Sequence, residues 1–562
     1  MFLEFQLTSG PLPSVLLCLS VVGLLYWRFL RPALTKRRST LRHCPLAPGR
    51  FPPLLGAEAF IHTHPDGPHN LEIHWARDLQ ASVFTYPSLF GSDILFITDP
   101  LAAVAASALP MTDLESRIAC MLLGDGIVTS TPASEHHRRM RKALASSFSS
   151  ASIASLSPTF FRHARGLVDT IQDQIQSHRA CSPDPLPLDV VPLLNAVAFD
   201  ILAEAGLGYE SGCVESLRAR RRGDSKAVRD PLAAAFDSTN AAFTSQHPVT
   251  QVCLTFLGYM IPPLASSSIF ARNRAIKTSR RRMEKLALKM IEDRTSSPGA
   301  EMEAYGHIDI VSRLMFAARN SATAAKKEKD ILVAQISAFL FAGHETTAST
   351  LSWLILSLAT HQGFQARLAR SIEGLDWEHA ASDPLVEATV KEVLRLHPPS
   401  RVLRRTTKED GVILPLSRPL RDSKDELNGN DSGDLTKLVV PEGQDIVIGL
   451  AAINRSKDLW GVDADDFSPD RWFALPASHE GAHLPYDLAS FGFGPKTCLG
   501  ARFALFELKV LTAALVQHFH FIRRPDIEIV TRQGLFFRPA VKGEERMGPQ
   551  LPVLVTLRER FA

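Results

Sequence analysis

The sequence predicts a mainly α-helical protein with a small β-rich lobe. One continuous apolar run over residues 330–357 has the length and composition of a helix buried in the middle of a large domain. Residues 155–315 are largely helical in pattern, whereas residues 71–110 mix short apolar runs with turn residues, which favours strands at the edge of a small sheet. Hydrophobic residues make up 45% of the 562-residue chain, enough to fill the core of one large fold.

Charge and cysteine content exclude several classes of protein. The chain carries 62 Lys and Arg against 59 Asp and Glu, so its formal net charge is only +3. No basic and aromatic RNA-binding motif is present, and we expect no nucleic-acid partner. The seven cysteines are odd in number and include no Cys-x-x-Cys pair, which argues against a zinc site or a disulfide framework. Reduced thiols facing the cytosol fit this pattern best.

The first 31 residues predict a membrane anchor. An apolar run from Pro13 to Trp27 is followed by a series of cations, while only Glu4 precedes it. This asymmetry places the N-terminus in the lumen and the rest of the chain in the cytosol. A cleaved signal peptide is the alternative, but such a peptide carries its cations before the apolar run. The cations that follow the run are Arg28, Arg31, Lys36, Arg37, Arg38 and Arg42.

Residues 32–56 predict a basic stop-transfer region and a proline-rich hinge, because closely spaced prolines stiffen a linker. A polyproline ligand for another domain is the alternative interpretation. The main domain is expected to occupy residues 57–562. Within it, the polar and glycine-punctuated stretch 421–437 is typical of a disordered surface loop.

The stretch most typical of a chemical site is Phe-Gly-Phe-Gly-Pro-Lys-Thr-Cys-Leu-Gly, residues 491–500. It is too rich in glycine and proline for regular structure, and a helix is expected to begin at Ala501. A thiol just before a helix N-terminus is favoured as a thiolate, and the glycines let a flat body approach the backbone. Cys498 is therefore a candidate ligand for haem iron. A buried cysteine in an ordinary turn is the plainer interpretation.

The apolar helix over 330–357 contains residues that do not suit a buried helix. Gly343 and the β-branched Thr346 are poor helix formers, and a buried Glu345 needs a partner. Such departures tend to mark function. A simple break in the helix is the alternative.

Two further helices carry paired charges. Glu392 and Arg395 stand three residues apart in a helix predicted over 384–396. His137 and Arg141 share one face of a basic helix predicted over 135–144. A merely solvated basic helix remains the alternative for the second pair.

In chain order, the acid–threonine run, the Glu-x-x-Arg spacing and the cysteine loop resemble the motifs of the cytochrome P-450 monooxygenases, most closely those of microsomal, fungal-type members. The loop follows the family pattern Phe-x-x-Gly-x-Arg-x-Cys-x-Gly except that Lys496 stands in place of arginine. The resemblance implies the cytochrome P-450 fold, with Cys498 as the axial ligand of a haem. It also implies that Thr346 hydrogen-bonds dioxygen, that Glu345 relays protons from solvent, and that Gly343 lets both oxygen and haem approach the helix.

The resemblance assigns further residues to the haem and its support. The family carries Trp-x-x-x-Arg on the basic helix, so His137 and Arg141 are expected to contact a haem propionate, as is Lys496. An arginine from the segment 401–405 is expected to do the same; Arg404 is favoured over Arg401 and Arg405. The resemblance also implies a network of three residues behind the cysteine loop, namely Glu392, Arg395 and Arg471.

The function implied is that of a monooxygenase anchored in the endoplasmic reticulum membrane by a single span, with its catalytic domain facing the cytosol. Electrons would come from NADPH–cytochrome P-450 reductase, because the chain holds no flavin or nicotinamide domain of its own. A basic face that includes Arg139, Lys142 and Lys496 is the expected docking surface. Two alternatives remain: a haem-thiolate isomerase or dehydratase that needs no reductase, and a non-catalytic haem carrier or sensor.

The substrate is expected to be lipophilic: a terpenoid, a sterol, a fatty acid or another secondary metabolite. The residues expected to line its pocket are apolar, and they are Phe339, Phe341, Leu535, Phe536 and Phe537.

Overall fold

The fold is described from a computed structural model, which covers residues 40–52, 56–65, 67–88, 92–224, 229–244, 267–295, 325–420, 435–480 and 484–558. The predicted anchor over 1–31 and most of the predicted 421–437 loop lie outside these residues, as do residues 32–39 of the hinge. Among the helices within the described ranges, none combines the length and the apolar character that a bilayer crossing requires.

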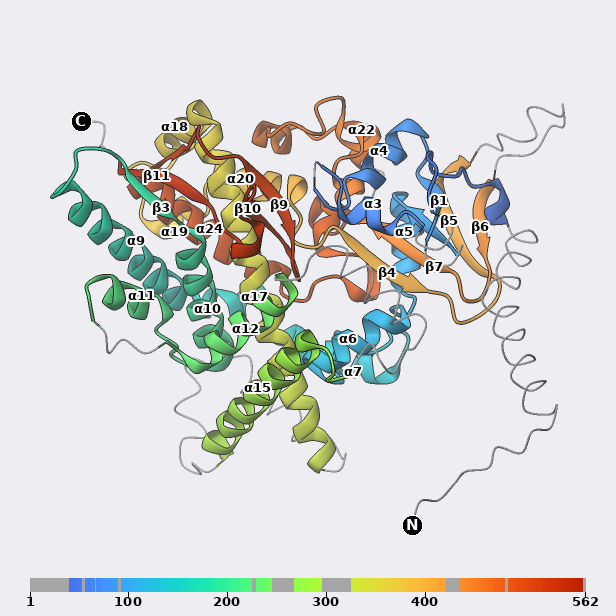
Figure 1. Cartoon of the computed structure of the whole chain (residues 1–562), viewed down its shortest axis with the longest axis horizontal. Coiled ribbons are helices and arrows are strands. Elements are labelled where there is room, and N and C mark those ends of the chain that lie inside the picture. The colour runs from blue at the N-terminus through green and yellow to red at the C-terminus, as the bar shows by residue number, and fades with distance from the viewer. Residues whose placement is uncertain are drawn as a thin grey trace, which may run out of the picture.

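The chain is mainly helical, as the sequence predicts, with its strands gathered in small sheets (Figure 1). The first helices are α3 (Glu58–His62), α4 (Leu71–Asp78), α5 (Pro100–Ser107), α6 (Asp113–Leu123), α7 (Glu135–Ala145), α8 (Ser150–Ser155), α9 (Ser157–Arg179), α10 (Val191–Leu207), α11 (Cys213–Arg221) and α12 (Pro231–Thr244). They are followed by α15 (Ala271–Thr295), α17 (Ala325–Thr360), α18 (Gln362–Ser371), α19 (Trp377–Ala381), α20 (Pro384–Leu396), α21 (Leu450–Asn454), α22 (Lys457–Trp460), α23 (Ala477–Glu480) and α24 (Ala501–His518).

Helix α17 runs through the middle of the molecule (Figure 1) and packs against α10, α15, α20, α24 and β10. Its crossing with α10 is close because each helix places a glycine against a large side chain of the other. A Cβ on Gly206 would lie 2.1 Å from the Phe339 ring, and one on Gly343 would lie 2.7 Å from Leu202. Gly343 therefore accommodates a neighbouring helix, whereas the sequence motif suggested that it leaves room for oxygen and haem.

Helix α20 has the bounds that the sequence predicts. Asp383 caps it by accepting hydrogen bonds from the amides of Leu385 and Val386, and Pro384 occupies the first turn, where its missing amide hydrogen costs nothing. Its apolar side is buried against α17 and α24. Because of this packing, Glu392 and Arg395 point toward the protein interior.

Within the described residues, the strands form four small sheets. The largest has the order β1-β2-β7-β4, in which only the β2–β7 pair is parallel. The others are β3-β11-β8, the hairpin β9-β10 and the pair β5-β6. The strands are β1 (Val83–Pro87), β2 (Asp93–Ile97), β3 (Leu186–Asp189), β4 (Val402–Thr406), β5 (Val412–Leu420), β6 (Leu435–Val440), β7 (Asp445–Gly449), β8 (Phe519–Arg523), β9 (Ile529–Gln533), β10 (Phe537–Val541) and β11 (Pro552–Leu557).

The β-rich lobe has a small core of its own. Aromatic side chains from α4, β1 and β2 meet there, with the Trp75 and Tyr86 rings 5.6 Å apart and those of Phe84 and Phe96 4.9 Å apart. The helices and the remaining strands share a second, much larger core. The cysteine loop and α17 both belong to the larger core, which therefore holds the candidate site.

Candidate functional site

The loop before α24 is a sequence of tight turns. Two 3₁₀ turns, Ala489–Phe491 and Gly494–Lys496, are separated by Gly492, whose φ is +70°. Gly494 has a φ of +53°, and a Cβ there would lie 2.8 Å from the Ser107 hydroxyl oxygen. The backbone amide of Cys498 donates to the carbonyl oxygen of Phe491 over 2.7 Å and closes the loop. Glycine is required at both positions because side chains rarely adopt this φ.

Cys498 lies in a recess of the protein. Its side chain has exposed surface, yet burial by the surrounding protein raises the pKa of its thiol above the ordinary value. The backbone amide of Gly500 and the charge of Arg141 act in the opposite direction and favour the thiolate. A side chain that is both accessible and surrounded by protein can bind a group that enters the recess.

One stretch in the middle of α17 is accessible, although most of the residues around it are buried. Ala342 is exposed and Thr346, one turn later, is partly exposed. Phe339 lies on the same side of the helix, and its ring is 5.8 Å from that of Phe148 and 6.4 Å from that of Phe503, near the start of α24. The accessible side of α17 therefore faces the start of α24, where the cysteine loop ends.

The acid and the alcohol of α17 have different surroundings. The Thr346 hydroxyl donates to the Ala342 carbonyl oxygen over 2.8 Å, so its oxygen can still accept a hydrogen bond. Glu345 is buried, with Oε2 3.2 Å from Nη2 of Arg538 and Oε1 3.5 Å from Nε2 of His344. Burial alone would raise the pKa of Glu345, but Arg538 and then His344 outweigh it and lower the pKa to about 2. Glu345 is thus a carboxylate at neutral pH.

Helix α7 holds the cysteine loop through two backbone carbonyls. His137 Nε2 lies 3.3 Å from the Pro495 carbonyl oxygen, which can only accept, so this nitrogen carries a proton. Burial is the largest cause that lowers the pKa of His137, followed by the charge of Lys496. Arg141 donates to the Thr497 carbonyl oxygen over 2.9 Å. Both residues that the sequence assigned to the haem thus fix the loop around Cys498.

Lys496 points inward. Its Nζ donates to the carbonyl oxygens of Ile127, Val128 and Ser130 at 2.9, 3.0 and 2.7 Å. Burial, followed by the charges of Arg405 and Arg141, lowers the pKa of Lys496 to about 7. Its contacts tie the cysteine loop to the segment between α6 and α7.

The arginines of β4 diverge, because neighbouring side chains of a strand point to opposite faces. Arg404 pairs with Glu58, 3.4 Å away. Burial would raise the pKa of the Glu58 carboxyl, but the charge of Arg404 outweighs burial and holds this pKa well below its usual range. Arg405 is buried, donates to the Ser107 carbonyl oxygen over 3.4 Å, and acts electrostatically on Lys496. Arg405 therefore lies nearer the cysteine loop, and a contact of Arg404 with a haem propionate stays a prediction.

Glu392, Arg395 and Arg471 meet behind the loop. Glu392 Oε1 is 2.8 Å from Arg395 Nη2 and 3.0 Å from Arg471 Nε, and all three side chains are buried. Arg395 also donates to the carbonyl oxygens of Asn454 and Asp466 at 2.9 and 3.0 Å. The three residues join α20 to the segments that lead into the cysteine loop.

Sequence reasoning missed two charged residues that contact α17. Arg538 follows the Leu-Phe-Phe turn, and Glu507 lies about two turns into the apolar α24. Glu507 Oε2 accepts from the Thr347 hydroxyl over 3.1 Å, and burial raises its pKa well above the ordinary value. The signal that could have identified these two residues was a single charged side chain within an otherwise apolar segment. Neither residue belongs to the sequence motifs described above.

The residues around Cys498 fit a haem. The thiol is a soft donor for iron, and its loop ends at α24, whose Phe503 ring lies 6.4 Å from that of Phe339 on the exposed side of α17. The amide of Gly500 and the charge of Arg141 favour the anionic form of the thiol. Arg141, Arg405 and Lys496 supply cations beside it that suit the carboxylates of such a group.

Comparison with known proteins agrees with this geometry. The family model described as Cytochrome P450 matches residues 110–415 and 432–544. Cytochrome P450 monooxygenase 205 of Postia placenta is 30% identical, with 77% of this chain and 78% of that protein aligned, and monooxygenase 91 of the same fungus is 27% identical over 77% and 80%. Cytochrome P450 monooxygenase claO of Ampulloclitocybe clavipes is 28% identical over 89% and 91%. The chain therefore belongs to the cytochrome P450 family, the oxidoreductases whose haem iron is bound by a cysteine thiolate.

Proposed function

We propose that this chain is a membrane-anchored monooxygenase that oxidises a lipophilic small molecule with O2 and with electrons from NADPH–cytochrome P-450 reductase. The observation that carries the proposal is the accessible thiol of Cys498, which lies just before α24. The exposed side of α17 faces the start of that helix and carries Thr346, with the buried acid Glu345 next to it. The names of the fungal relatives, all monooxygenases, support the same reaction class.

The chain's own residues divide the work among them. Cys498 would bind the iron of the haem, with Arg141 and Lys496 beside its propionates and Arg405 as a further candidate. When bound, the haem supplies the activation of dioxygen and the transfer of one oxygen atom to the substrate. The Thr346 hydroxyl, whose oxygen can still accept a hydrogen bond, would hold a proton at the reacting oxygen, and Glu345 would replace that proton from solvent.

The walls near α17 favour an apolar substrate. The Phe341 and Phe536 rings lie 6.0 Å apart, and Phe536 belongs to the turn between β9 and β10. Apolar side chains from two distant segments thus meet at one place, and such a wall selects for lipophilic molecules by excluding water. A terpenoid, a sterol, a fatty acid or another secondary metabolite would suit it.

The reductase would dock on the basic side of α7. Arg139 and Lys142 lie on exposed positions of this helix, whereas Lys496 is turned toward backbone carbonyls and contributes less to the surface. An acidic partner would approach the same side of the molecule as the cysteine loop, which α7 contacts through His137 and Arg141. The apolar run and the cations after it in the first 42 residues support a single-pass anchor in the endoplasmic reticulum membrane.

The test of this function is spectroscopic and chemical. The reduced, carbon monoxide-treated protein is expected to show the red-shifted Soret band of thiolate-bound iron. Membranes that contain the protein and the reductase are expected to add one oxygen atom to a lipophilic substrate, measured by mass spectrometry. Cys498→Ser should abolish both, while Cys181→Ser, which removes another exposed thiol, should change neither. A normal Soret band in the Cys498 variant would refute the assignment.

A second variant separates this reaction from the two alternatives. Thr346→Ala removes the hydroxyl beside Glu345 without adding bulk. We expect it to uncouple the enzyme, so that reductant consumption continues while product formation falls at least tenfold, because proton delivery of this kind contributes about 10²–10⁴-fold. An isomerase, a haem carrier or a sensor has no use for this hydroxyl. An unchanged ratio of product to NADPH consumed would contradict the proposed role.

A further inference from the structure

Arg401 is a buried cation, and within the described residues it forms no ion pair with a carboxylate. Its side chain is only 4% exposed. Burial, followed by the charge of Arg455, lowers its pKa to about 9, although the charge of Glu72 acts in the opposite direction. A buried charge without such a partner is unfavourable for the fold, and departures of this kind tend to mark function.

Arg401 joins three segments that are distant in sequence. Its Nη1 donates to the carbonyl oxygen of Pro68, in the connection between α3 and α4, over 2.8 Å. Its Nη2 donates to the hydroxyl oxygen of Thr531, on β9, over 3.3 Å. Its Cζ lies 5.0 Å from the centre of the Phe537 ring, at the start of β10, which is a cation–π contact. One guanidinium thus holds both strands of the β9-β10 hairpin.

The β9-β10 hairpin depends on such contacts for its position. A sheet of two strands is marginally stable in water, so neighbouring segments must hold it. The backbone of Phe537 is held by α17, because its carbonyl oxygen accepts from the Ser349 hydroxyl over 2.7 Å and from the Trp353 indole over 3.1 Å. Its ring is held by Arg401 and by His69, whose ring lies 5.8 Å away at an angle of 76°. Loss of a ring contact would therefore loosen the hairpin without detaching it from α17.

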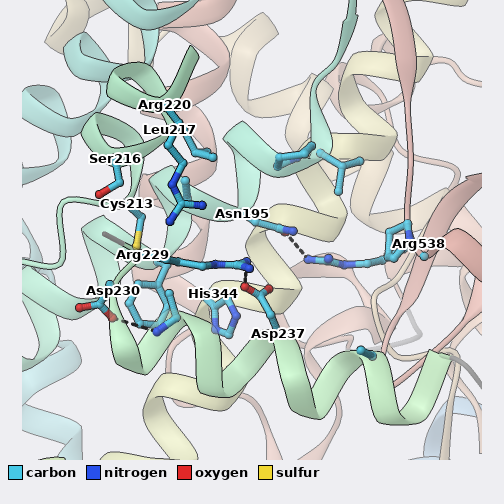
Figure 2. A pocket seen from close by; sticks show the side chains of 18 of the residues that line it. Asn195, Cys213, Ser216, Leu217, Arg220, Arg229, Asp230, Asp237, His344 and Arg538 are labelled. Atoms are coloured by element: carbon cyan, nitrogen blue, oxygen red, sulfur yellow. Dashed lines mark hydrogen bonds and ion pairs between the residues drawn. The ribbon is translucent and has the colours of Figure 1, made fainter. Parts of the chain in front are cut away.

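The two neighbours of Phe537 have other partners, as expected where side chains alternate along a strand. The Phe536 ring lies 6.0 Å from that of Phe341 on α17. Arg538 is directed toward Asn195 of α10 (Figure 2), to which it donates over 2.7 Å. The ring of Phe537 is thus the support behind Phe536, and its position determines how closely Phe536 approaches α17.

We propose that Arg401 is a positioning residue that determines which substrates fit. It holds Phe537 and with it the β9-β10 hairpin, and the hairpin in turn fixes Phe536 in the wall beside Phe341. Only a planar fork of donors can bind two segments and lie over a ring at the same time, which accounts for an arginine at this position. The inference rests on the proposed function, because this wall selects substrates only if a lipophilic molecule binds beside α17.

Haem ligands of graded length measure where the wall stands. 1-Alkylimidazoles bind haem iron through nitrogen and shift the Soret band, whatever reaction the protein catalyses. Each further methylene that the pocket buries should tighten binding roughly fourfold until the chain reaches the wall. In Arg401→Met we expect this increase to continue for about two more methylenes, because a loosened Phe536 yields to a longer chain. The same limiting length in the variant and the wild type would overturn the proposal.

Arg455→Met is the matched control. Arg455 also holds the connection between α3 and α4, since it donates to Asn70 Oδ1 over 3.3 Å, and it pairs with Asp465 at 2.7 Å. Its hydrogen bonds and ion pairs in the described part of the chain do not include Phe537, so its limiting length should equal that of the wild type. Because Arg401→Met removes a cation whose burial is unfavourable, its Tm should stay close to the wild-type value. A lower Tm with an unchanged limiting length would mean that Arg401 is merely structural.

A double-mutant cycle tests whether Arg401 acts through the ring of Phe537. Phe537→Leu should lengthen the limit by itself, and adding Arg401→Met should then have no further effect. Additive shifts would refute action through the ring. If Arg401→Met folds poorly, Arg401→Lys keeps the cation but replaces the fork with a single amine, and it should shift the limit in the same direction. Unchanged limits in these variants refute the role of Arg401, whereas a wild type that binds alkylimidazoles but oxidises no substrate refutes the proposed function.

Discussion

At the scale of single residues, the two departures from the family pattern lie together. His137 stands where tryptophan is usual and Lys496 where arginine is usual. His137 Nδ1 is 3.0 Å from the Ser130 hydroxyl, and Lys496 donates to the carbonyl oxygen of the same serine over 2.7 Å. The smaller ring and the shorter cation thus share Ser130 as a partner. Each departure from the family pattern therefore fits the other in space. This relation is not visible when the two sequence positions are considered one at a time.

Glu507 is a buried acid that the proposed chemistry does not use. It is 1% exposed, and its Oε1 has no hydrogen-bond partner in the described ranges. Because its pKa in the folded protein is raised by burial, the folded protein keeps a proton that the unfolded chain loses above its ordinary pKa. Stability therefore falls as pH rises from about 4.5 toward that raised value, and Glu507 destabilises the fold at neutral pH.

This sign gives a prediction. Glu507→Gln keeps the acceptor for the Thr347 hydroxyl and removes the titrating group. We expect the variant to be more stable than the wild type at pH 7.5, seen as a higher Tm, and the difference to shrink as the pH approaches 4. A difference in Tm that stays constant over this range would show that Glu507 is not neutral in the folded protein.

At the scale of elements, the crossing of α10 and α17 decides how α17 is placed. Phe339 lies over Gly206 and also touches Phe148 and Phe503, so its ring connects three elements around the recess. The glycine that permits this is unfavourable for α10 as a helix, by about 1 kcal/mol relative to alanine. Packing therefore outweighs helix propensity at this position.

Substitution of this glycine tests the balance. In Gly206→Ala the new Cβ would lie 2.1 Å from the Phe339 ring, and overpacking of this kind costs about 1–3 kcal/mol, more than the propensity gains. We expect a lower Tm. Gly166→Ala in α9 is the matched control, because a Cβ there meets nothing within 4 Å, and it should raise the Tm slightly. Tm shifts of the same sign would contradict the argument.

At the scale of the whole molecule, Glu392 links segments that are far apart in sequence. It accepts from Arg395 in its own helix, from Arg471 and the Ser468 amide, and from the Trp472 indole. Its two oxygens thus accept from all of these groups, although Arg471 also pairs with Asp463 over 2.9 Å. The network therefore holds the meander that precedes the cysteine loop against α20.

Removal of this one charge is expected to be costly. Glu392→Gln leaves the buried Arg395 guanidinium without its anion and leaves Arg471 with Asp463, and breaking a buried pair costs about 3–5 kcal/mol. Glu387→Gln, on an exposed position of the same helix that pairs with Lys391 and Lys509 at 3.3 Å, should cost less than about 1 kcal/mol. Urea unfolding followed by circular dichroism measures both. Equal losses would mean that the buried network does not hold the meander.

The sequence predicted helices and strands better than it predicted which side chains contact one another. The bounds of α20 could be predicted from the sequence because its signals are local: Pro384 marks its first turn, and the structure adds Asp383 as its cap. Which of Arg404 and Arg405 lies nearer the cysteine loop could not be predicted from local signals. It depends on how β4 pairs with β7, where Arg404 lies opposite Val447 and Arg405 opposite Ile446. The pairing of Glu345 with Arg538 was likewise invisible, since the two residues come from separate elements, α17 and β10. Local signals predict elements, whereas side-chain partners depend on how distant segments meet.

The sheet β3-β11-β8 has a consequence for how the protein is made. Leu186 pairs with Val555, so the strand in the middle of this sheet is translated after both of its neighbours and long after β3. On the nascent chain, β3 and β8 therefore have no common partner until β11 has been made. A premature stop just before Pro552 would spare every residue of the candidate site, yet it would leave β3 and β8 without the strand that joins them.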